Sequence, residues 1–330
     1  MRGFYVRGLG LVTIALIGCT APVSDEPRAD ENIATTQQAI EGGVLATSSQ
    51  IQRAVRVSTP SGQCTGTRIF DDFVITALHC DTRVGSLVTF YSSGTAFPNN
   101  NDVTVSVVDV FQPPGTSWVG TDLGDVTDEN GDFADIELVK LSRTNLPPGP
   151  TATMSVTYPG SGGLGTKVGG GSHEGNVALL GILMRKHDTL WSGSDTGGAF
   201  RTNEYAVNSG DSGGPFYLQP NRSDDLRVLG VLSGRSVDFT RARYTSVAHH
   251  LNFILSKTGT RWSGFARRVG RIFGTLASTT QVGGLLPCEY SCERTSGCAG
   301  YTFNALTRAC QHFSHVTHAD DSPLFVSARK

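Results

Sequence analysis

Several features that mark other classes of protein are scarce or missing in this 330-residue chain. After residue 19 no apolar run approaches the roughly 20 residues that span a bilayer. The formal net charge is −2, so the chain lacks the basic surface that nucleic acid binding requires. Charged residues make up only 17% of the chain, whereas glycine is abundant at 40 residues. This composition favours a loop-rich β protein over a helical one.

Motifs for phosphates and metals are also missing. The glycine-rich run Gly160 to Gly171 contains no Lys-Ser or Lys-Thr pair to close a phosphate loop, so we expect turns between strands there. The cysteines lack the Cys-x2-Cys spacing of a zinc knuckle. The acidic residues from Asp122 to Asp132 do not fit a calcium-binding loop, and we expect a solvated loop. The sequence therefore predicts no metal and no cofactor.

The N-terminus has the pattern of an export signal. Arg2 and Arg7 precede an apolar run from Leu9 to Ile17, which is too short for a membrane anchor. The segment up to Cys19 resembles the bacterial lipoprotein signal, in which the cysteine is lipidated and attaches the protein to a membrane. A plain secretory signal, with an incidental Cys19, is the alternative. Residues 20–39 are predicted to form a flexible tether or propeptide, because they lack apolar periodicity.

Short apolar stretches separated by Gly, Pro, Asn and Ser follow from residue 40 onwards. Many short strands without alternating helices predict an antiparallel barrel or sandwich. Tyr244 to Leu255 is expected to be a strand that runs into a helix and ends this domain. The other predicted strands are Gln52–Ser58, Thr65–Phe70, Phe73–Ala77, Leu87–Tyr91, Val103–Phe111, Ile136–Leu141, Val177–Met184 and Arg227–Ser233.

Seven cysteines are present, and an odd number in an exported chain leaves one thiol with a separate role. Lipidation of Cys19 would leave six cysteines for three disulfides, which an exported protein can keep. Cys64 and Cys80 are close enough in sequence to join two adjacent strands. Closing that loop would stabilise the fold by roughly 3 kcal/mol on the chain-entropy model.

The segment Gly210 to Pro215, Gly-Asp-Ser-Gly-Gly-Pro, combines a hydroxyl nucleophile with glycines and an acidic neighbour. A serine hydroxyl is a weak nucleophile near neutral pH, so Ser212 needs a base and donors for a developing oxyanion. The glycines permit a tight turn, in which the N–H groups of Gly210 and Ser212 can face one concavity. Ordinary turns have a similar composition, so the prediction depends on partners elsewhere in the chain.

Two upstream segments supply those partners. The apolar stretch Val74 to Ala77 leads to His79, and a histidine pKa near neutrality suits a general base. The seven other histidines lack a comparable context. Asp135 leads into an apolar strand, where it can accept a hydrogen bond from the imidazole; a simple turn residue is the alternative. The chain order His, Asp, Ser favours the catalytic interpretation.

These motifs, Thr-Ala-Leu-His-Cys, Asp-Ile-Glu-Leu-Val-Lys-Leu and Gly-Asp-Ser-Gly-Gly-Pro, closely resemble those of the chymotrypsin and trypsin family of serine endopeptidases. The resemblance covers about residues 40–258. It implies an all-β fold of two six-stranded antiparallel barrels, with the triad His79, Asp135 and Ser212 in the cleft between them. It also implies an oxyanion hole from the N–H groups of Gly210 and Ser212, and a protein or peptide substrate.

The resemblance extends to activation and to substrate choice. Ile40-Glu41-Gly42-Gly43 is similar to the family's activated N-terminus, which implies that cleavage after Ala39 frees an Ile40 ammonium to pair with Asp211. Ala39 replaces the usual Lys or Arg, so we expect a non-tryptic activating protease. Ala206 stands where trypsin is acidic, so cleavage after Arg or Lys is not expected. Arg235 could favour an acidic substrate side chain or extend to solvent. The implied specificity pocket comprises Ala206, Ser233, Arg235 and Ala242.

A link at residues 259–263 is predicted to lead into a second module at residues 264–330. Four cysteines there surround the segment Ala299 to Phe303. The pattern resembles the PAN/apple family, a small helix-on-sheet module that binds proteins or carbohydrates. This resemblance implies disulfides Cys288–Cys310 and Cys292–Cys298, whereas spacing alone allows three connectivities.

The sequence thus predicts an exported serine endopeptidase that is made as a zymogen, with a signal at 1–19, a tether at 20–39 and a protease domain at 40–258. We expect it at the outer membrane or in the periplasm as a lipoprotein, or outside the cell after cleavage before Ile40. The rival hypothesis is a catalytically silent protease-like protein that binds through its apple-like module. An esterase with the same triad is a third hypothesis, but the motif order differs from that of α/β-hydrolases.

Overall fold

The structure is a computed structural model, and it describes residues 40–93, 99–119, 125–156, 162–171, 182–191, 197–218, 226–235, 240–258, 266–269, 271–319 and 325–329. The predicted signal with Cys19, the tether and the link at 259–263 lie outside the described residues. No helix of the described residues is both long and apolar enough to cross a membrane.

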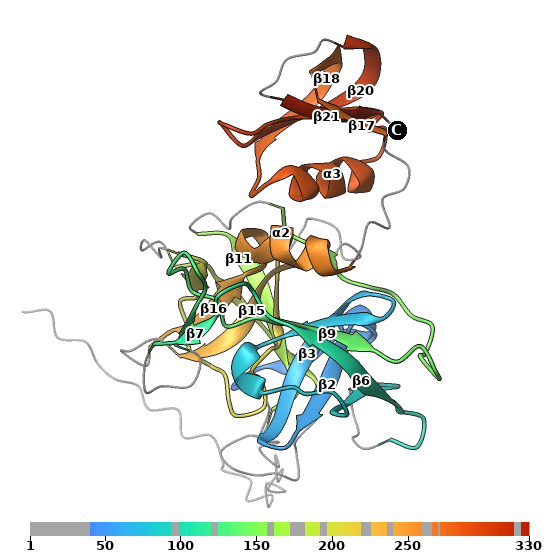
Figure 1. Cartoon of the computed structure of the whole chain (residues 1–330). Helices are drawn as coiled ribbons and strands as arrows, with labels where there is room; N and C mark the ends of the chain where they lie inside the picture. Colours follow the sequence, from blue (N-terminus) through green and yellow to red (C-terminus); the bar gives the residue numbers. More distant parts are fainter. Residues whose placement is uncertain are drawn as a thin grey trace, which may run out of the picture. The chain divides into compact units, whose positions relative to one another are not determined.

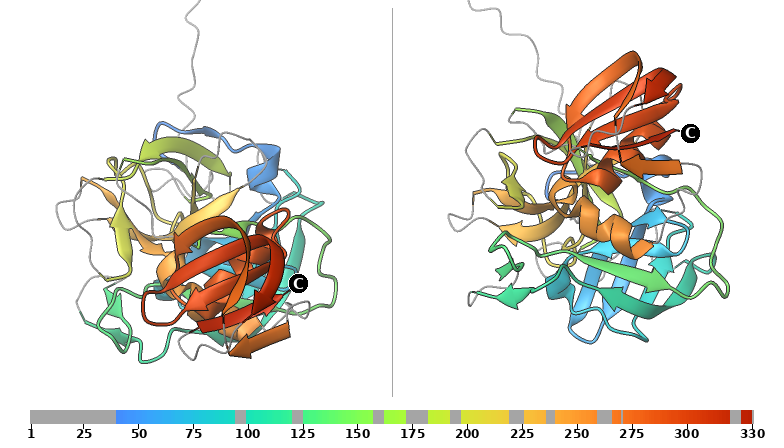
Figure 2. Two further views of the ribbon diagram at one scale, coloured as in Figure 1. Left: turned by 90° about the horizontal axis from the view of Figure 1, so that it is seen from above. Right: turned by 45° about the horizontal axis from the view of Figure 1, so that its top comes forward.

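The first half of residues 40–258 contains a closed six-stranded antiparallel barrel, coloured blue to green in Figures 1 and 2. Its core contains aliphatic side chains such as Val55 and Val57, which are buried on either side of the less buried Arg56. In β3 every residue from Cys64 to Phe70 is buried, so this strand is covered on both faces. In barrel order the strands are β2 (Ala54–Thr59), β3 (Gly62–Phe70), β4 (Phe73–Thr76), β9 (Glu137–Leu141), β6 (Val103–Phe111) and β5 (Leu87–Phe90).

The second half is an eight-stranded sheet. Six of its strands have three or more residues, and the two-residue strands β1 and β10 bring the total to eight. A hydrophobic cluster that includes Phe200, Phe216 and Tyr244 forms its core. Along the sheet the strands are β1 (Val44–Leu45), β12 (Met184–Thr189), β11 (Leu164–Gly169), β14 (Pro215–Leu218), β15 (Arg227–Arg235), β16 (Ala242–Ser246) and β13 (Ala199–Arg201), and β10 (Thr153–Met154) pairs with β15 in parallel.

The strand pattern agrees with the prediction except in two places. The predicted strand Val177–Met184 falls largely outside the described residues, and β12 begins where that prediction ends. The predicted strand and helix at Tyr244–Leu255 correspond to β16 and α2 (Val247–Thr258). The remaining short elements are α1 (Ser48–Ile51), the 3-10 helix η1 (Leu78–Cys80), β7 (Ser117–Trp118) and β8 (Val126–Thr127).

The second exception is the glycine-rich run Gly160 to Gly171, for which the prediction of turns was wrong. Residues 164–169 of that run form β11. A Cβ on Gly165 would lie 2.2 Å from the ring of Phe216, and a Cβ on Gly169 would lie 2.2 Å from the carboxyl group of Asp211. These glycines therefore allow an aromatic ring and a buried carboxyl group to pack against a strand, and they do not mark turns.

The C-terminal residues form a five-stranded antiparallel sheet with helix α3 (Leu285–Arg294) against one face (Figure 1). The disulfide Cys288–Cys310 ties the helix to the sheet, and Cys292–Cys298 closes the turn after the helix. They join the same cysteines as the predicted pairs. In sheet order the strands are β17 (Ala266–Val269), β21 (Phe325–Arg329), β19 (Gly300–Asn304), β20 (Ala309–Ala319) and β18 (Ile272–Gln281).

Candidate active site

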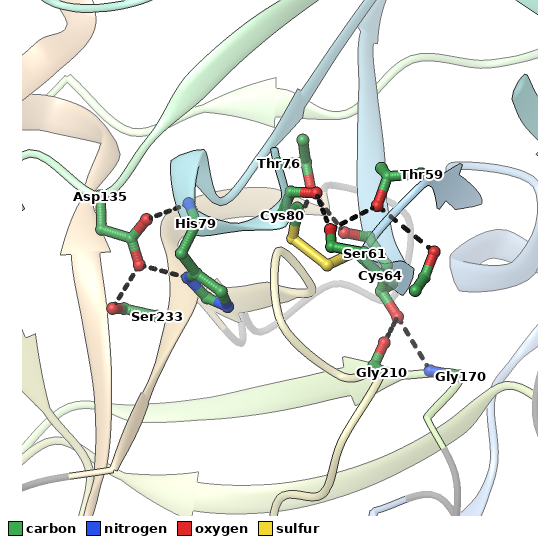
Figure 3. The surroundings of a disulfide bond; sticks show 12 residues. Thr59, Ser61, Cys64, Thr76, His79, Cys80, Asp135, Gly170, Gly210 and Ser233 are labelled. Carbon is green, nitrogen blue, oxygen red and sulfur yellow. Dashed lines mark hydrogen bonds and ion pairs between the residues drawn. A yellow bond between two sulfur atoms is a disulfide. The ribbon is translucent and has the colours of Figure 1, made fainter. Parts of the chain in front are cut away.

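His79 and Asp135 meet because their strands are neighbours. β4 and β9 are antiparallel and pair Thr76 with Glu137, so the chain leaving β4 and the chain entering β9 lie at the same end of the barrel. His79 Nδ1 is 2.7 Å from Asp135 Oδ2, and the backbone N–H of His79 donates to Asp135 Oδ1 at 2.9 Å (Figure 3). The Asp135 side chain is fully buried, and that of His79 is 10% exposed.

The second sheet supplies further donors to Asp135. The hydroxyl of Ser233, in β15, donates to Asp135 Oδ2 at 2.5 Å (Figure 3), and that of Thr245, in β16, donates to the Asp135 carbonyl at 2.8 Å. Sequence reasoning placed Ser233 in the specificity pocket and missed both contacts. A carboxylate held in this way keeps the imidazole proton on Nδ1, which leaves Nε2 free to accept a proton.

The loop that carries Ser212 packs directly on the segment before His79. The backbone N–H of Thr65, in β3, donates to the Ser212 carbonyl at 2.8 Å. Gly213 has a φ of 82°, and a Cβ there would lie 2.1 Å from both the Thr65 carbonyl oxygen and Thr76 Oγ1. Only glycine permits this approach. The structure thus brings the three predicted catalytic segments together.

The predicted oxyanion donors lie in the same loop. Gly210 adopts a φ of 94°, which glycine tolerates without strain. Within the described residues, the N–H groups of Gly210 and Ser212 have no hydrogen-bond acceptor, whereas that of Asp211 donates to the Asn208 carbonyl at 3.0 Å. Two such donors can stabilise negative charge on a substrate oxygen.

Asp211 is fully buried between the loop and β11. Its carboxyl group accepts from the backbone N–H groups of Gly171 and Asn208, each at 2.8 Å. Burial raises the pKa of Asp211 to about 7, because the charged form loses its hydration. Ile40, its predicted activation partner, is also fully buried, in the hydrophobic cluster of the second sheet. In the uncleaved chain the Ile40 nitrogen belongs to a peptide bond and carries no charge.

Three of the four predicted pocket residues can be placed. Ala206 and Ala242 are buried, and Ala206 has a φ of 33°. Ser233 contacts Asp135, as described, and the side chain of Arg235 lies outside the described residues.

A buried ion pair supports the chain before Ala206. Lys167 Nζ lies 2.7 Å from Asp188 Oδ2 and donates to the Glu204 carbonyl at 3.0 Å.

Breaking this buried ion pair should destabilise the protein. The side chains of Lys167 and Asp188 are only 1% and 3% exposed, so Lys167→Met leaves a carboxylate buried without its cation. We expect a loss of about 3–5 kcal/mol in the free energy of unfolding, measured by urea denaturation. Lys186→Met is the matched control, because Lys186 pairs with Glu204 at a more exposed position and should contribute about 0–1 kcal/mol. Equal losses in the two variants would contradict the prediction.

The acidic loop before Asp135 makes side-chain contacts that the sequence did not predict. Asp125 pairs with Arg243 at 2.9 Å, and Asp132 Oδ2 lies 3.0 Å from His249 Nε2. Asp128 adds a third group, and one ligand-type atom from each of Asp128, Asp132 and His249 lies within 4.8 Å of the others. Asp122 lies outside the described residues. The side chains of Asp125 and Asp132 are 32% and 33% exposed, so they are partly solvated, and each also contacts a side chain of β16 or α2 that the sequence did not predict.

Comparisons with known proteins agree with this architecture. The solved structure of mouse neuropsin, a serine protease expressed in the limbic system of the brain, matches with a TM-score of 0.52 and 18% sequence identity, over 67% of this chain and 100% of that chain. At this identity the match supports the fold. No curated protein matches the sequence. The sequence model of the trypsin family matches residues 40–254. That match spans well over half of the chain, so the chain belongs to the trypsin family.

Proposed function

We propose that the protein is a serine endopeptidase that acts through Ser212, His79 and Asp135. The observation that carries this proposal is the buried Asp135 carboxylate, 2.7 Å from His79 Nδ1, beside a loop that presents Ser212. Ser212 Oγ attacks the peptide carbonyl while its proton passes to His79 Nε2. Asp135 stabilises the imidazolium, and the N–H groups of Gly210 and Ser212 bind the oxyanion.

The acyl-enzyme then forms and is hydrolysed by the reverse proton transfers. The C–N bond breaks, and the leaving amine takes the proton from His79. A water molecule gives a proton to His79 and attacks the ester carbonyl, and collapse of the second tetrahedral intermediate returns that proton to Ser212. The products are an acid and an amine, and His79 and Ser212 recover their starting protonation states.

The enzyme is further proposed to be a zymogen. The carboxyl group of Asp211 is buried and forms no ion pair within the described residues, and burial outweighs the smaller effect of Lys167 in raising its pKa. Cleavage before Ile40 would create an ammonium that lowers this pKa and fixes the oxyanion loop.

Export, lipidation and the role of the C-terminal module are parts of the same proposal. The signal pattern ending at Cys19 and the three disulfides support an oxidising location outside the cytoplasm. The disulfide-linked helix and sheet at residues 266–329 support an apple-like module. That module would hold the enzyme near a protein or carbohydrate ligand.

Labelling by a fluorophosphonate probe tests the activity and the activation step together. The full chain should carry a recognition sequence for a site-specific protease immediately before Ile40. We expect labelling at Ser212, located by peptide mapping, only after that protease has cut the chain. Ser212→Ala, cut in the same way, is the matched control and should stay unlabelled.

Each outcome has a separate meaning. Labelling of Ser212 to the same extent before and after the cut would contradict the zymogen but keep the enzyme. An unlabelled, cut chain that retains its folded circular dichroism spectrum would overturn the proposed activity. The catalytically silent, ligand-binding alternative would then be favoured.

A further inference from the structure

Thr65 occupies a buried position between the two halves of the candidate active site. It follows Cys64 in β3 and is 1% exposed. Its hydroxyl donates to the Gly210 carbonyl at 2.9 Å and accepts from the Gly170 N–H at 3.1 Å. A hydroxyl has one proton, a carbonyl can only accept, and an N–H can only donate, so the roles of all three groups are fixed. Dashed lines in Figure 3 mark these hydrogen bonds of Gly170 and Gly210.

The backbone of Thr65 joins the same segments. Its N–H donates to the Ser212 carbonyl at 2.8 Å, and its carbonyl accepts from the Thr76 hydroxyl at 2.8 Å. Thr76 ends β4, three residues before His79. Thr65 therefore contacts three parts of the candidate site. These are β4, which leads to His79, the proposed nucleophile Ser212 and the proposed oxyanion donor Gly210.

The Thr65 hydroxyl binds the part of the loop whose backbone is least restricted by a side chain. Gly210 has no side chain to restrict its backbone, and it adopts a φ of 94°. A hydrogen bond to its carbonyl restricts the rotation that separates the N–H of Gly210 from that of Ser212. Gly170 precedes Gly171, whose N–H donates to Asp211 Oδ1 at 2.8 Å. The same hydroxyl therefore binds the Ser212 loop at Gly210 and, at Gly170, the segment that donates to Asp211.

We infer that the Thr65 hydroxyl is a positioning group for oxyanion stabilisation: it holds Gly210 so that the N–H groups of Gly210 and Ser212 converge on one substrate oxygen. The hydrogen bond from Thr65 to Ser212 goes to the backbone carbonyl and not to the reacting Oγ, and the Thr65 hydroxyl acts through Gly210. The inference rests on the proposed serine endopeptidase function.

Two substitutions at this position separate the hydroxyl from the rest of the side chain. Thr65→Val keeps the shape but leaves the Gly210 carbonyl and the Gly170 N–H without their buried partner. Thr65→Ser keeps the hydroxyl and removes only a methyl group. Both are made in the full chain with the cleavable sequence before Ile40, and the concentration of active sites is titrated with the fluorophosphonate probe.

The measurement is kcat per titrated site and KM for hydrolysis of p-nitrophenyl acetate, an active ester. For T65V we expect kcat to fall by roughly 10- to 100-fold with KM unchanged, somewhat less than the loss of a direct oxyanion donor. T65S should stay within about threefold of the wild-type chain, since the hydrogen-bonding group is kept. A merely structural role would lower the number of titratable sites and the thermal midpoint, but not kcat per site.

The outcomes separate the inference from the proposed function. An active wild-type chain with an unchanged T65V would overturn the inference, and so would equal losses in T65V and T65S. A wild-type chain that neither hydrolyses the ester nor reacts with the probe after cleavage would overturn the proposed function and the inference with it. If T65V does not fold, Thr65→Ala makes the same comparison against T65S, because it also removes the hydroxyl.

Discussion

Asp135→Asn is expected to lower kcat by about 10⁴-fold, the loss known for the equivalent change in the family's catalytic triad. The asparagine side chain matches aspartate in size, but its NH₂ group donates where Oδ2 now accepts from the imidazole and from Ser233. The imidazole is then held in the wrong tautomer, and no negative charge stabilises the imidazolium. Hydrolysis of an active ester by the chain cut before Ile40 measures the effect.

Two control variants test whether the loss of activity is specific to the Asp135 carboxylate. Asp109→Asn changes an exposed aspartate in β6 and should leave the activity unchanged. Ser233→Ala removes one hydrogen bond to Asp135 but keeps the carboxylate, so we expect a loss of less than about tenfold. A D135N variant that stays within tenfold of the wild-type chain would show that another group orients His79.

Glu137→Gln is expected to change the pH dependence of stability. Glu137 is 1% exposed in β9, and burial, with smaller contributions from Asp135 and Asp81, raises its pKa from 4.5 to about 8. Below pH 4.5 both the folded and the unfolded chain bind this proton. Between pH 4.5 and 8 only the unfolded chain releases it, so wild-type stability falls as the pH rises, and the full penalty is present above pH 8. Glutamine does not titrate and removes this slope.

Urea unfolding of both chains at pH 5, 7 and 9 measures the difference. From pH 5 to 9 the wild-type chain should lose about 4 kcal/mol more than the variant, as the pKa shift requires. Other buried carboxyl groups, including Asp211, are common to both chains and cancel in this comparison. Glu129→Gln, at an exposed loop position, should follow the wild-type chain. Parallel pH profiles for E137Q and the wild-type chain would contradict the prediction.

The features that could be predicted from the sequence are those encoded by neighbouring residues. The segments around His79, Asp135 and Ser212 are each short and contiguous, and the apolar stretches beside them mark the strands that carry them. The all-β fold class followed from the same stretches. The trypsin-family match and the closed barrel confirm it.

The supporting contacts could not be predicted, because they join residues far apart in the chain. The partners of the hydrogen bonds from Ser233 and Thr245 to Asp135 are separated by 98 and 110 residues, and those of the bond from Thr65 to Gly210 by 145. No local pattern specifies these pairs. The prediction of turns at Gly165 and Gly169 failed because a local glycine pattern is typical of turns. In the fold these glycines leave space beside a strand for Phe216 and Asp211.

The division of the site between two sheets has a consequence for the order in which the chain is made. His79 and Asp135 belong to the first barrel, whereas Ser212 precedes β14 of the second sheet. Synthesis proceeds from the N-terminus, so His79 and Asp135 leave the ribosome before Ser212, and before Ser233 and Thr245 that hydrogen-bond to Asp135. A half-finished chain of the proposed enzyme therefore holds no assembled site and cannot digest its neighbours. This protection follows from the division of the site between the two sheets. It acts before the proposed activation by cleavage before Ile40.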